Sequence, residues 1–133
     1  MSRRLRGRCL CGVCHYDTDA EPLNIRVCHC RRCQRMTGSA FFARVLVALD
    51  QVSIRGPVGW YGEEEGLQRG FCTQCGSTLF SARRHAHTIG LALGSLDEPD
   101  LYPPTEHIWL SSKQHWVCID DGLVQYSEGV PLT

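Results

Sequence analysis

The sequence predicts a mainly β domain, and three observations support this fold class. Apolar and β-branched residues gather in short runs, and these runs are bounded by Gly, Pro, Asp or Ser. No long segment has the 3.6-residue apolar period of a helix. The length of 133 residues is that of one domain able to bury a core, so we expect a single domain over residues 1–133.

Seven segments have the composition of strands, because each is short and rich in β-branched or aromatic residues. In chain order they are residues 13–18, 40–47, 51–55, 77–80, 88–93, 107–110 and 116–119. Residues 30–36 are expected to form a single helical turn that Thr37-Gly38 ends. The glycine-rich segment 56–70 is predicted to be a hairpin end or mobile loop, and the proline-containing segment 96–106 an irregular connection.

Seven of the nine cysteines lie in close clusters, which is typical of ligands for a soft metal such as zinc. The clusters are Cys9-x-Cys11, Cys28-x-Cys30-x2-Cys33 and Cys72-x2-Cys75. Zinc takes four protein ligands where its role is structural, and three plus an exchangeable position where its role is chemical. Seven ligands divide as four and three, so the count predicts one closed structural zinc ion and one open, reactive zinc ion.

A disulfide framework is the main alternative for so many cysteines. The chain begins with charged residues and has no leading apolar segment, so we expect neither a secretory precursor nor a membrane anchor, and a cytoplasmic location. The odd number of cysteines and the missing export signal both favour metal binding over disulfides. No apolar run approaches the ~18 residues that cross a bilayer.

The first cluster extends to Cys9-x-Cys11-x2-Cys14, which has the spacing of the second cluster. The cysteines could therefore also form two three-thiol sites and a separate pair, with Cys14 as a ligand. If this segment is extended, Cys9 and Cys11 share one side and Cys14 points to the other, because side chains alternate along a strand. This favours Cys14 as a small buried residue, and Cys118, within an apolar run, is interpreted in the same way.

The 14 basic and 14 acidic side chains cancel, so no overall field attracts nucleic acid or an anionic membrane. Arg31, Arg32 and Arg35 surround the second cluster, where they either form a solvated edge or attract an anion. His29, inside that cluster, is a candidate proton carrier or a residue that orients a metal ligand through a hydrogen bond. His107 is a further candidate to reach the open metal, with a backbone partner as the alternative.

Several motifs occur together in one order along the chain. They are GRCLCG at 7–12, CHCRRC at 28–33, GS at 38–39, RGFCTQCGSTLF at 69–80, GSLD at 94–97 and HIW at 107–109. Together they resemble the glutathione-dependent formaldehyde-activating enzyme family, which also includes centromere protein V. The resemblance covers about residues 5–125.

This resemblance implies a zinc-stapled β-tent of small antiparallel sheets, with Zn²⁺ at two sites. It implies a structural zinc ion on Cys9, Cys11, Cys72 and Cys75, and a second zinc ion with an open fourth position on Cys28, Cys30 and Cys33. It also implies a small thiol such as glutathione and a small aldehyde such as formaldehyde as partners. Cys14 departs from the usual pattern of the family.

The chemistry of a three-thiolate zinc site is consistent with that reaction. Three anionic sulfurs give the site a net negative charge, so it activates water less than a neutral three-histidine site does. A substrate thiol in the open position would ionise more readily and attack a small carbonyl carbon. Glutathione and formaldehyde would then give S-hydroxymethylglutathione.

The predicted function is therefore that of a zinc-dependent carbon–sulfur lyase. Cys28, Cys30 and Cys33 would form its open zinc site, and Arg31, Arg32 and Arg35 would pair with carboxylates of the thiol. One alternative is a non-catalytic zinc module whose Arg-rich edge contacts nucleic acid or protein. Another is a redox or metal-storage protein that uses the thiolates of the second cluster.

Overall fold

The computed structural model describes residues 4–131, so the outermost residues of the predicted 1–133 domain lie outside it. The described chain is mainly β, as predicted. Its strands are β1 (Leu5–Arg8), β2 (His15–Thr18), β3 (Asn24–Cys28), β4 (Phe42–Ala48), β5 (Val52–Arg55), β6 (Val58–Gly62), β7 (Leu67–Cys72), β8 (Thr78–Arg83), β9 (Thr88–Ala92), β10 (Glu106–Ile108) and β11 (Val124–Gln125). The α-helix α1 (Arg31–Thr37) connects β3 to β4.

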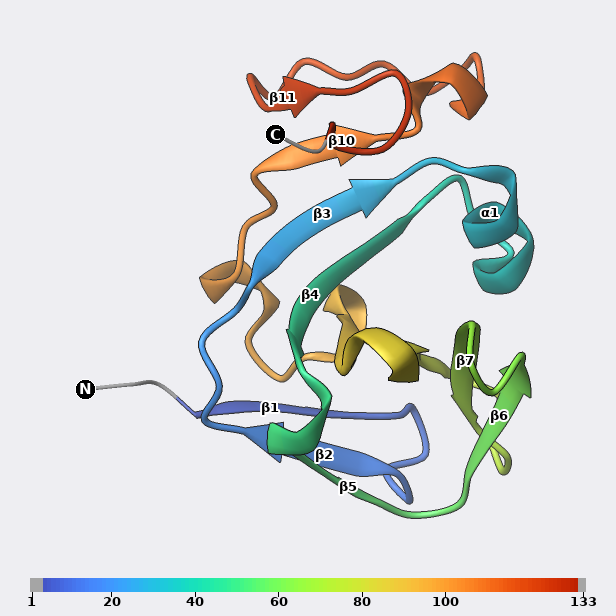
Figure 1. Cartoon of the computed structure of the whole chain (residues 1–133), viewed down its shortest axis with the longest axis vertical. Coiled ribbons are helices and arrows are strands. Elements are labelled where there is room, and N and C mark those ends of the chain that lie inside the picture. The colour runs from blue at the N-terminus through green and yellow to red at the C-terminus, as the bar shows by residue number, and fades with distance from the viewer. Residues whose placement is uncertain (1–3, 132–133) are drawn as a thin grey trace.

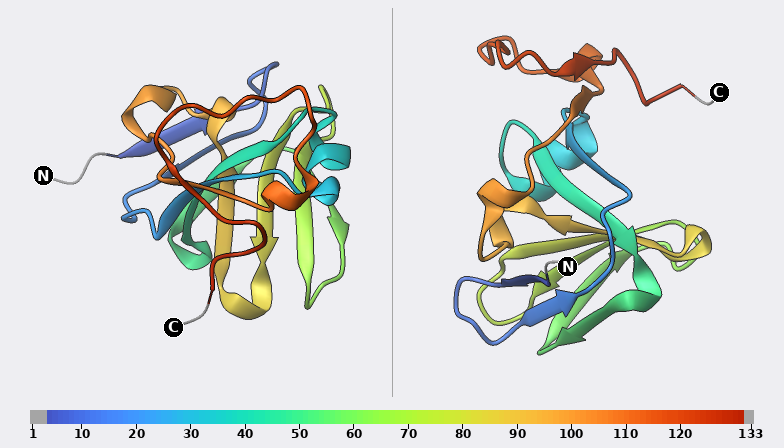
Figure 2. Two further views of the ribbon diagram at one scale, coloured as in Figure 1. Left: turned by 90° about the horizontal axis from the view of Figure 1, so that it is seen from above. Right: turned by 90° about the vertical axis from the view of Figure 1, so that its left-hand side faces the viewer.

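The strands form two sheets. The small sheet has the order β1-β2-β5, and the large sheet has the order β11-β10-β3-β4-β9-β8-β7-β6. Neighbouring strands are antiparallel except that β10 is parallel to both β3 and β11. Figures 1 and 2 show the small sheet at one end of the molecule and β10 with β11 at the other.

The main core lies between the two sheets. It includes Leu5 and Tyr16 from the small sheet, and Val45, Val47 and Phe80 from the large one. Phe80 packs edge-on against Tyr16, with ring centroids 5.1 Å apart. Side chains alternate between the two faces of a strand. Val45 and Val47 of β4 therefore point into this core, and Arg44 and Leu46 point to the opposite face of the sheet, where they line a cavity.

Six of the seven predicted strand segments contain a strand, and residues 116–119 do not. The Val117 amide donates to the carbonyl of Gln114, so this segment forms a local turn. The Trp116 indole also donates to the Gln114 side chain at 2.6 Å. Trp116 and Cys118 are exposed, so the prediction of a buried Cys118 is wrong.

The glycine-rich segment 56–70 is a hairpin, one of the two predicted alternatives, and not a mobile loop: β6 and β7 pair antiparallel, with residues 63–66 between them. At Gly70, a Cβ atom would lie 2.8 Å from the Trp60 ring and 2.9 Å from the Phe80 ring. Glycine at this position therefore permits close packing between strands. Segment 96–106 is mainly irregular, as predicted, with a short 3-10 turn at Pro99–Leu101.

The predicted helical turn is confirmed as α1, a helix of seven residues. It ends at Gly38, which has a φ of 65° and donates its amide to the carbonyl of Gln34. Glycine takes this left-handed conformation without a steric cost. Among residues 4–131, no helix is long and apolar enough to cross a membrane.

Candidate metal centres and the adjoining arginine cavity

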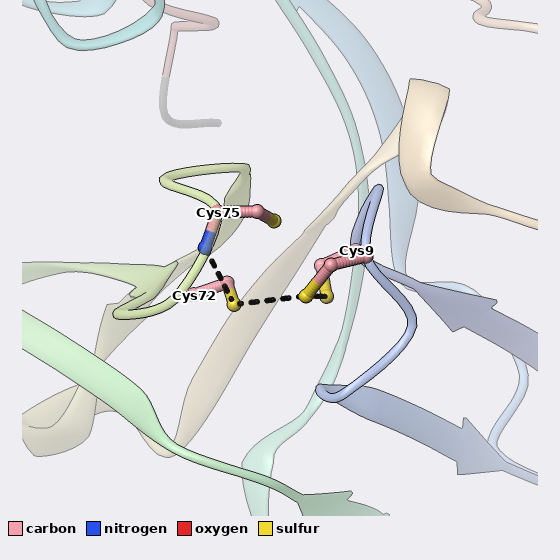
Figure 3. Close-up of side chains that lie close together, drawn as sticks. Cys9, Cys72 and Cys75 are labelled. Atoms are coloured by element: carbon pink, nitrogen blue, oxygen red, sulfur yellow. Dashed lines mark hydrogen bonds between the residues drawn. The ribbon is translucent and has the colours of Figure 1, made fainter.

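The structure brings two of the predicted cysteine clusters together. Cys9 and Cys11 follow β1, Cys72 ends β7 and Cys75 lies in the next turn. Figure 3 shows Cys9, Cys72 and Cys75 close together, and the four sulfurs, including that of Cys11, lie within 4.8 Å of one another. We call these residues the four-cysteine cluster.

The donor set and spacing of this cluster fit a zinc ion. Tetrahedral zinc with bonds of about 2.3 Å would place its sulfur ligands roughly 3.8 Å apart. The sulfur of Cys11 lies 3.6 Å from that of Cys9 and 3.9 Å from that of Cys72. All nine cysteines are free, so no disulfide competes for these sulfurs.

The loop after β1 is a tight turn and not an extended strand. The Cys9 amide donates to the carbonyl of Cys14, and Gly12 has a φ of 83°. The predicted burial of Cys14 is confirmed, but strand alternation is not its cause, because this segment is not extended. Cys14 lies outside the four-cysteine cluster, and its backbone amide donates to the sulfur of Cys9 at 3.3 Å.

The turn after β7 directs donors at the cysteine sulfurs. The amides of Gln74 and Cys75 donate to the sulfur of Cys72 at 3.3 Å and 3.4 Å. Gly76 has a positive φ of 78°, which closes the turn. The hydroxyl of Ser77 lies 3.1 Å from the sulfur of Cys75 and lowers the pKa of that thiol to about 5. These donors favour the thiolate form that binds metals.

Cys28, Cys30 and Cys33 form the three-cysteine cluster at the junction of β3 and α1. Their sulfurs also lie within 4.8 Å of one another. Cys30 is the N-cap of α1, and its sulfur accepts the amide of Cys33 at 3.3 Å. In the described chain no fourth cysteine, histidine or carboxylate joins this group. Three thiol donors fit a zinc ion with one position left for another ligand.

A cavity of about 630 Å³ opens beside the three-cysteine cluster. All three cysteines line it, and so do six arginines and no acidic residue of the described chain. The arginines are Arg26, Arg31, Arg32, Arg44, Arg69 and Arg83. We call this hollow the arginine cavity, and its lining suits an anion.

Two of the three arginines predicted for anion binding, Arg31 and Arg32, line the arginine cavity. Arg35 instead lines two other hollows. The four arginines that come from strands were not predicted from the sequence. Arg44 offered a signal, because it is a charged residue inside a predicted strand that is otherwise apolar.

Arg69 connects the cavity to the cysteines. Its guanidinium lies 3.7 Å from the sulfur of Cys33 and 6.0 Å from the centroid of the Phe42 ring. The pKa of Cys33 is lowered to about 5, mainly by the hydrogen bond from Cys28 and further by Arg69, whereas the pKa of Cys28 is raised. Without a metal, Cys33 is therefore the thiolate of this pair.

His29 lies between two of the clustered cysteines, but its side chain joins a different group. Its Nε2 lies 2.9 Å from Nδ1 of His107, and Nε2 of His107 lies 2.7 Å from the Asp121 carboxylate. Because the Nε2–H of His107 donates to this carboxylate, Nδ1 of neutral His107 accepts the hydrogen bond from the Nε2–H of His29.

The His29 ring is fully buried, which lowers its pKa to about 4, with His107 adding to the shift. His29 is therefore neutral near pH 7, and its Nδ1 has no partner within the described chain. His107 was predicted as a candidate to reach the open metal. Both of its ring nitrogens are instead hydrogen-bonded, to His29 and to Asp121. Asp121 was missed because no motif links it to His107, 14 residues earlier.

Comparisons with known proteins bear on the fold and on the family. A crystal structure of a Rhodobacter sphaeroides protein has the same fold, with a TM-score of 0.58 and 22% identity over 91% of this chain and 98% of that one. A Schizosaccharomyces pombe protein named "Uncharacterized lyase C29B12.13" is 34% identical over 76 residues, or 57% of this chain. The match spans 56% of that curated relative's length.

The sequence model of one family, described as glutathione-dependent formaldehyde-activating enzyme, matches residues 4–112. This range contains both cysteine clusters and every residue that lines the arginine cavity. The chain therefore belongs to the glutathione-dependent formaldehyde-activating enzyme family.

Proposed function

We propose that this protein is a zinc-dependent carbon–sulfur lyase that forms or cleaves an adduct between a glutathione-like thiol and a small aldehyde such as formaldehyde. One observation carries the proposal: three cysteines that can hold a metal open into a cavity lined by six arginines. The cavity can hold a small anion beside the cysteines. Membership of the family supports the choice of thiol and aldehyde.

Each part of the site has a role in this reaction. Cys28, Cys30 and Cys33 would hold the zinc ion, which when bound supplies a position that favours the thiolate form of the substrate sulfur. The cavity arginines would bind the negative charges of the thiol, and Arg69 would favour negative charge next to the cysteines. Phe42 and Ile108 give this end of the cavity an apolar wall.

The reaction balances without an oxidant or a reductant. In the forward direction the thiolate sulfur forms a bond to the carbonyl carbon, and the carbonyl oxygen takes up the proton that the thiol lost. In the reverse direction the carbon–sulfur bond breaks, the hydroxyl proton leaves, and the aldehyde and thiolate are released. A site that binds the thiol as an anion and releases it again can serve both directions.

The four-cysteine cluster would hold the second, structural zinc ion. Its donors come from the loop after β1 and from the end of β7, which belong to different sheets. A metal bound there would fasten the small sheet to the large one. It would act on stability and not on the reaction, because four protein sulfurs leave no position for a substrate.

The proposal is tested by following S-hydroxymethylglutathione formation from glutathione and formaldehyde by NMR exchange, against the spontaneous rate. Zinc-loaded protein is expected to accelerate the exchange. Cys30→Ser should abolish the acceleration, because serine is a poor zinc ligand but can still cap α1. Cys118→Ser, an exposed position outside both clusters, is the matched control and should retain activity. Zinc-loaded protein with no acceleration would overturn the proposal.

Binding to nucleic acid is expected to be absent. The cavity arginines converge on one hollow and do not form a broad flat face that could follow a phosphate backbone. A salt-sensitive, submicromolar complex with DNA or RNA would favour the alternative of a nucleic-acid-binding zinc module.

A further inference from the structure

The buried histidines beside the three-cysteine cluster have no part in the proposed reaction, and their contacts indicate a different role. We propose that Asp121 is a positioning residue that acts through His107 and His29 to hold the three-cysteine cluster in its metal-binding arrangement. This inference rests on the proposed function only in taking the cluster as a metal site. It concerns the order of that site and not the thiol or aldehyde that the protein uses.

His29 lies between two cysteines of the cluster, and its ring faces away from them. Cys28 ends β3, and Cys30, with a φ of −64° and a ψ of 153°, is also extended. Side chains alternate along an extended chain, so both cysteines face one side and His29 faces the other. In agreement, both cysteines line the arginine cavity, whereas His29 is fully buried and does not line it. Contacts that hold the His29 ring therefore also hold the direction of two of the three sulfurs.

The backbone of His29 is bonded to two neighbouring elements. Its amide donates to the carbonyl of Ile108 in β10 at 3.0 Å. Its carbonyl accepts the side-chain amide of Gln34, a buried residue of α1, at 2.7 Å. The same amide group donates to the carbonyl of Ser112 at 2.9 Å. These bonds join the metal-binding turn to the segment that follows β10.

The ring of His29 is held by a chain of side chains that ends at Asp121. The hydrogen bond from His107, and further the amide of Leu123, lower the pKa of Asp121, so it is a carboxylate near pH 7. A carboxylate only accepts hydrogen bonds, so it keeps the proton of His107 on Nε2. Nδ1 of His107 is then an acceptor and takes the Nε2–H of His29. Asp121 therefore sets the tautomer of both rings.

The opposite pair of tautomers would leave a donor unpaired in the interior. Nδ1–H of His107 would then donate to Nε2 of His29, and the proton of His29 would lie on its Nδ1. Both histidines are buried, and Nδ1 of His29 has no partner within residues 4–131. A buried N–H without an acceptor destabilises the folded state. Asp121 excludes this arrangement, because it leaves only one position for the proton of His107.

The segment that carries Asp121 is itself fastened to β10. The Tyr126 amide donates to the carbonyl of His107 at 2.9 Å. Strand β11 runs parallel to β10, with Gln125 opposite His107. Figure 1 shows this last segment beside β10, on the side away from β3. The bond between Asp121 and His107 therefore couples the end of the chain to the three-cysteine turn.

The first experiment compares zinc-loaded Asp121→Asn with the unmodified protein at pH 7.5, and measures the rate at which a colorimetric chelator takes up each ion. Asparagine can donate or accept at His107, so it no longer sets the tautomers. Loss of such an outer partner typically weakens metal binding about 10–100-fold. The ion of the three-cysteine cluster should therefore leave about tenfold faster, and that of the four-cysteine cluster at an unchanged rate. Asp120→Asn, at the neighbouring exposed carboxylate, is the matched control and should change neither rate.

Two further measurements test the route through His107. Nitrogen-15 NMR of the rings reports which nitrogen carries the proton. Nε2–H is expected for His29 and His107 in the unmodified protein, and a mixture of tautomers in Asp121→Asn. His107→Asn retains an acceptor for His29 but is too short to reach Asp121. Adding Asp121→Asn to this variant should not accelerate zinc release further, because residues that act through one another are not additive.

The outcomes separate this inference from the proposed function. An unchanged release rate in Asp121→Asn, or an effect of Asp121→Asn that persists in His107→Asn, overturns the inference even if adduct formation is accelerated. Equally faster release from both clusters also overturns it, because that result shows a general loss of stability. Faster release from the three-cysteine cluster alone, together with mixed tautomers, supports the inference even if formaldehyde is not consumed.

Discussion

Both cysteine clusters offer thiol ligands, but the sequence separation between the cysteines within a cluster differs greatly. In the four-cysteine cluster, Cys11 and Cys72 are 61 positions apart and come from loops attached to different sheets. In the three-cysteine cluster, Cys28 and Cys33 belong to one strand–helix junction. A metal at the first cluster would join distant parts of the chain, and one at the second would order a local turn. The contrast supports the proposed structural role of the first cluster and the proposed chemical role of the second.

The two clusters also differ in burial, because one lies in the main core and the other opens into a cavity. The four-cysteine cluster includes two fully buried sulfurs within the main core, those of Cys9 and Cys72. The three-cysteine cluster belongs to a smaller core with Phe42 and Ile108 and opens into the arginine cavity. Loss of a ligand in the first cluster therefore disturbs the packing between the sheets. Loss of one in the second should mainly affect what the cavity binds.

The largest expected effect is a difference in stability between Cys72→Ser and Cys30→Ser. Structural zinc contributes on the order of 10 kcal/mol to folding, so Cys72→Ser should unfold or aggregate at room temperature. Cys30→Ser should remain folded with a modestly lower melting temperature, because its cluster is local and its N-cap is preserved. Circular dichroism melts of both variants check this. If Cys30→Ser is as unfolded as Cys72→Ser, the division of roles is wrong.

Metal removal should distinguish the clusters in the unmodified protein. Protein purified without chelator is expected to carry between one and two zinc ions per chain. A mild chelator should remove the ion of the three-cysteine cluster first, because that site has three protein ligands and an open cavity. Elemental analysis during the titration, with unfolding followed in parallel, measures this order. Simultaneous loss of both ions, or no zinc at all, would contradict it.

The sequence revealed local features of this site better than long-range ones. The short spacings within each cluster identified the cysteines, and Gly38 correctly marked the end of α1. Spacing alone did not show whether Cys9 and Cys11 share a metal with Cys72 and Cys75, because strand pairing decides which distant loops meet. The resemblance to the family supplied that pairing, and the structure places these four sulfurs together.

The cavity could not be predicted because its arginines come from four strands and a helix. Arg26, Arg44, Arg69 and Arg83 share no spacing along the chain, and the sheet register alone brings them to one face. Strand β7, which provides Arg69, was hidden by glycines that here permit close packing. The contact between His107 and Asp121 likewise depends on how the segment after β10 folds back.

A smaller effect is expected from the buried His29 when the pH falls. Unfolded histidine takes up a proton near pH 6.5, whereas folded His29 does so only near pH 4. Between these values the unfolded state binds more protons, so stability decreases as the pH falls. At pH 5 the loss relative to neutral pH should be up to about 2 kcal/mol, since one pKa unit corresponds to about 1.4 kcal/mol.

The measurement compares urea unfolding of zinc-loaded protein and of His29→Asn at pH 5 and pH 7.5. Asparagine can still donate a hydrogen bond to His107 but does not titrate. The difference between the two proteins removes the pH dependence of metal binding, which both share. An equal pH dependence in both would show that His29 does not contribute in this way.

The smallest expected effects concern the two cysteines that lie outside both clusters. Cys14 is 1% exposed, so Cys14→Ala should cost the packing of a small buried side chain, roughly 1 kcal/mol. Its backbone amide, which donates to the sulfur of Cys9, remains in the variant. Cys118 is exposed, so Cys118→Ala should change the free energy of unfolding by less than about 0.5 kcal/mol. Both variants should retain the zinc content of the unmodified protein. Release of a zinc ion from Cys14→Ala would instead place Cys14 among the ligands and favour the alternative of two three-thiol sites.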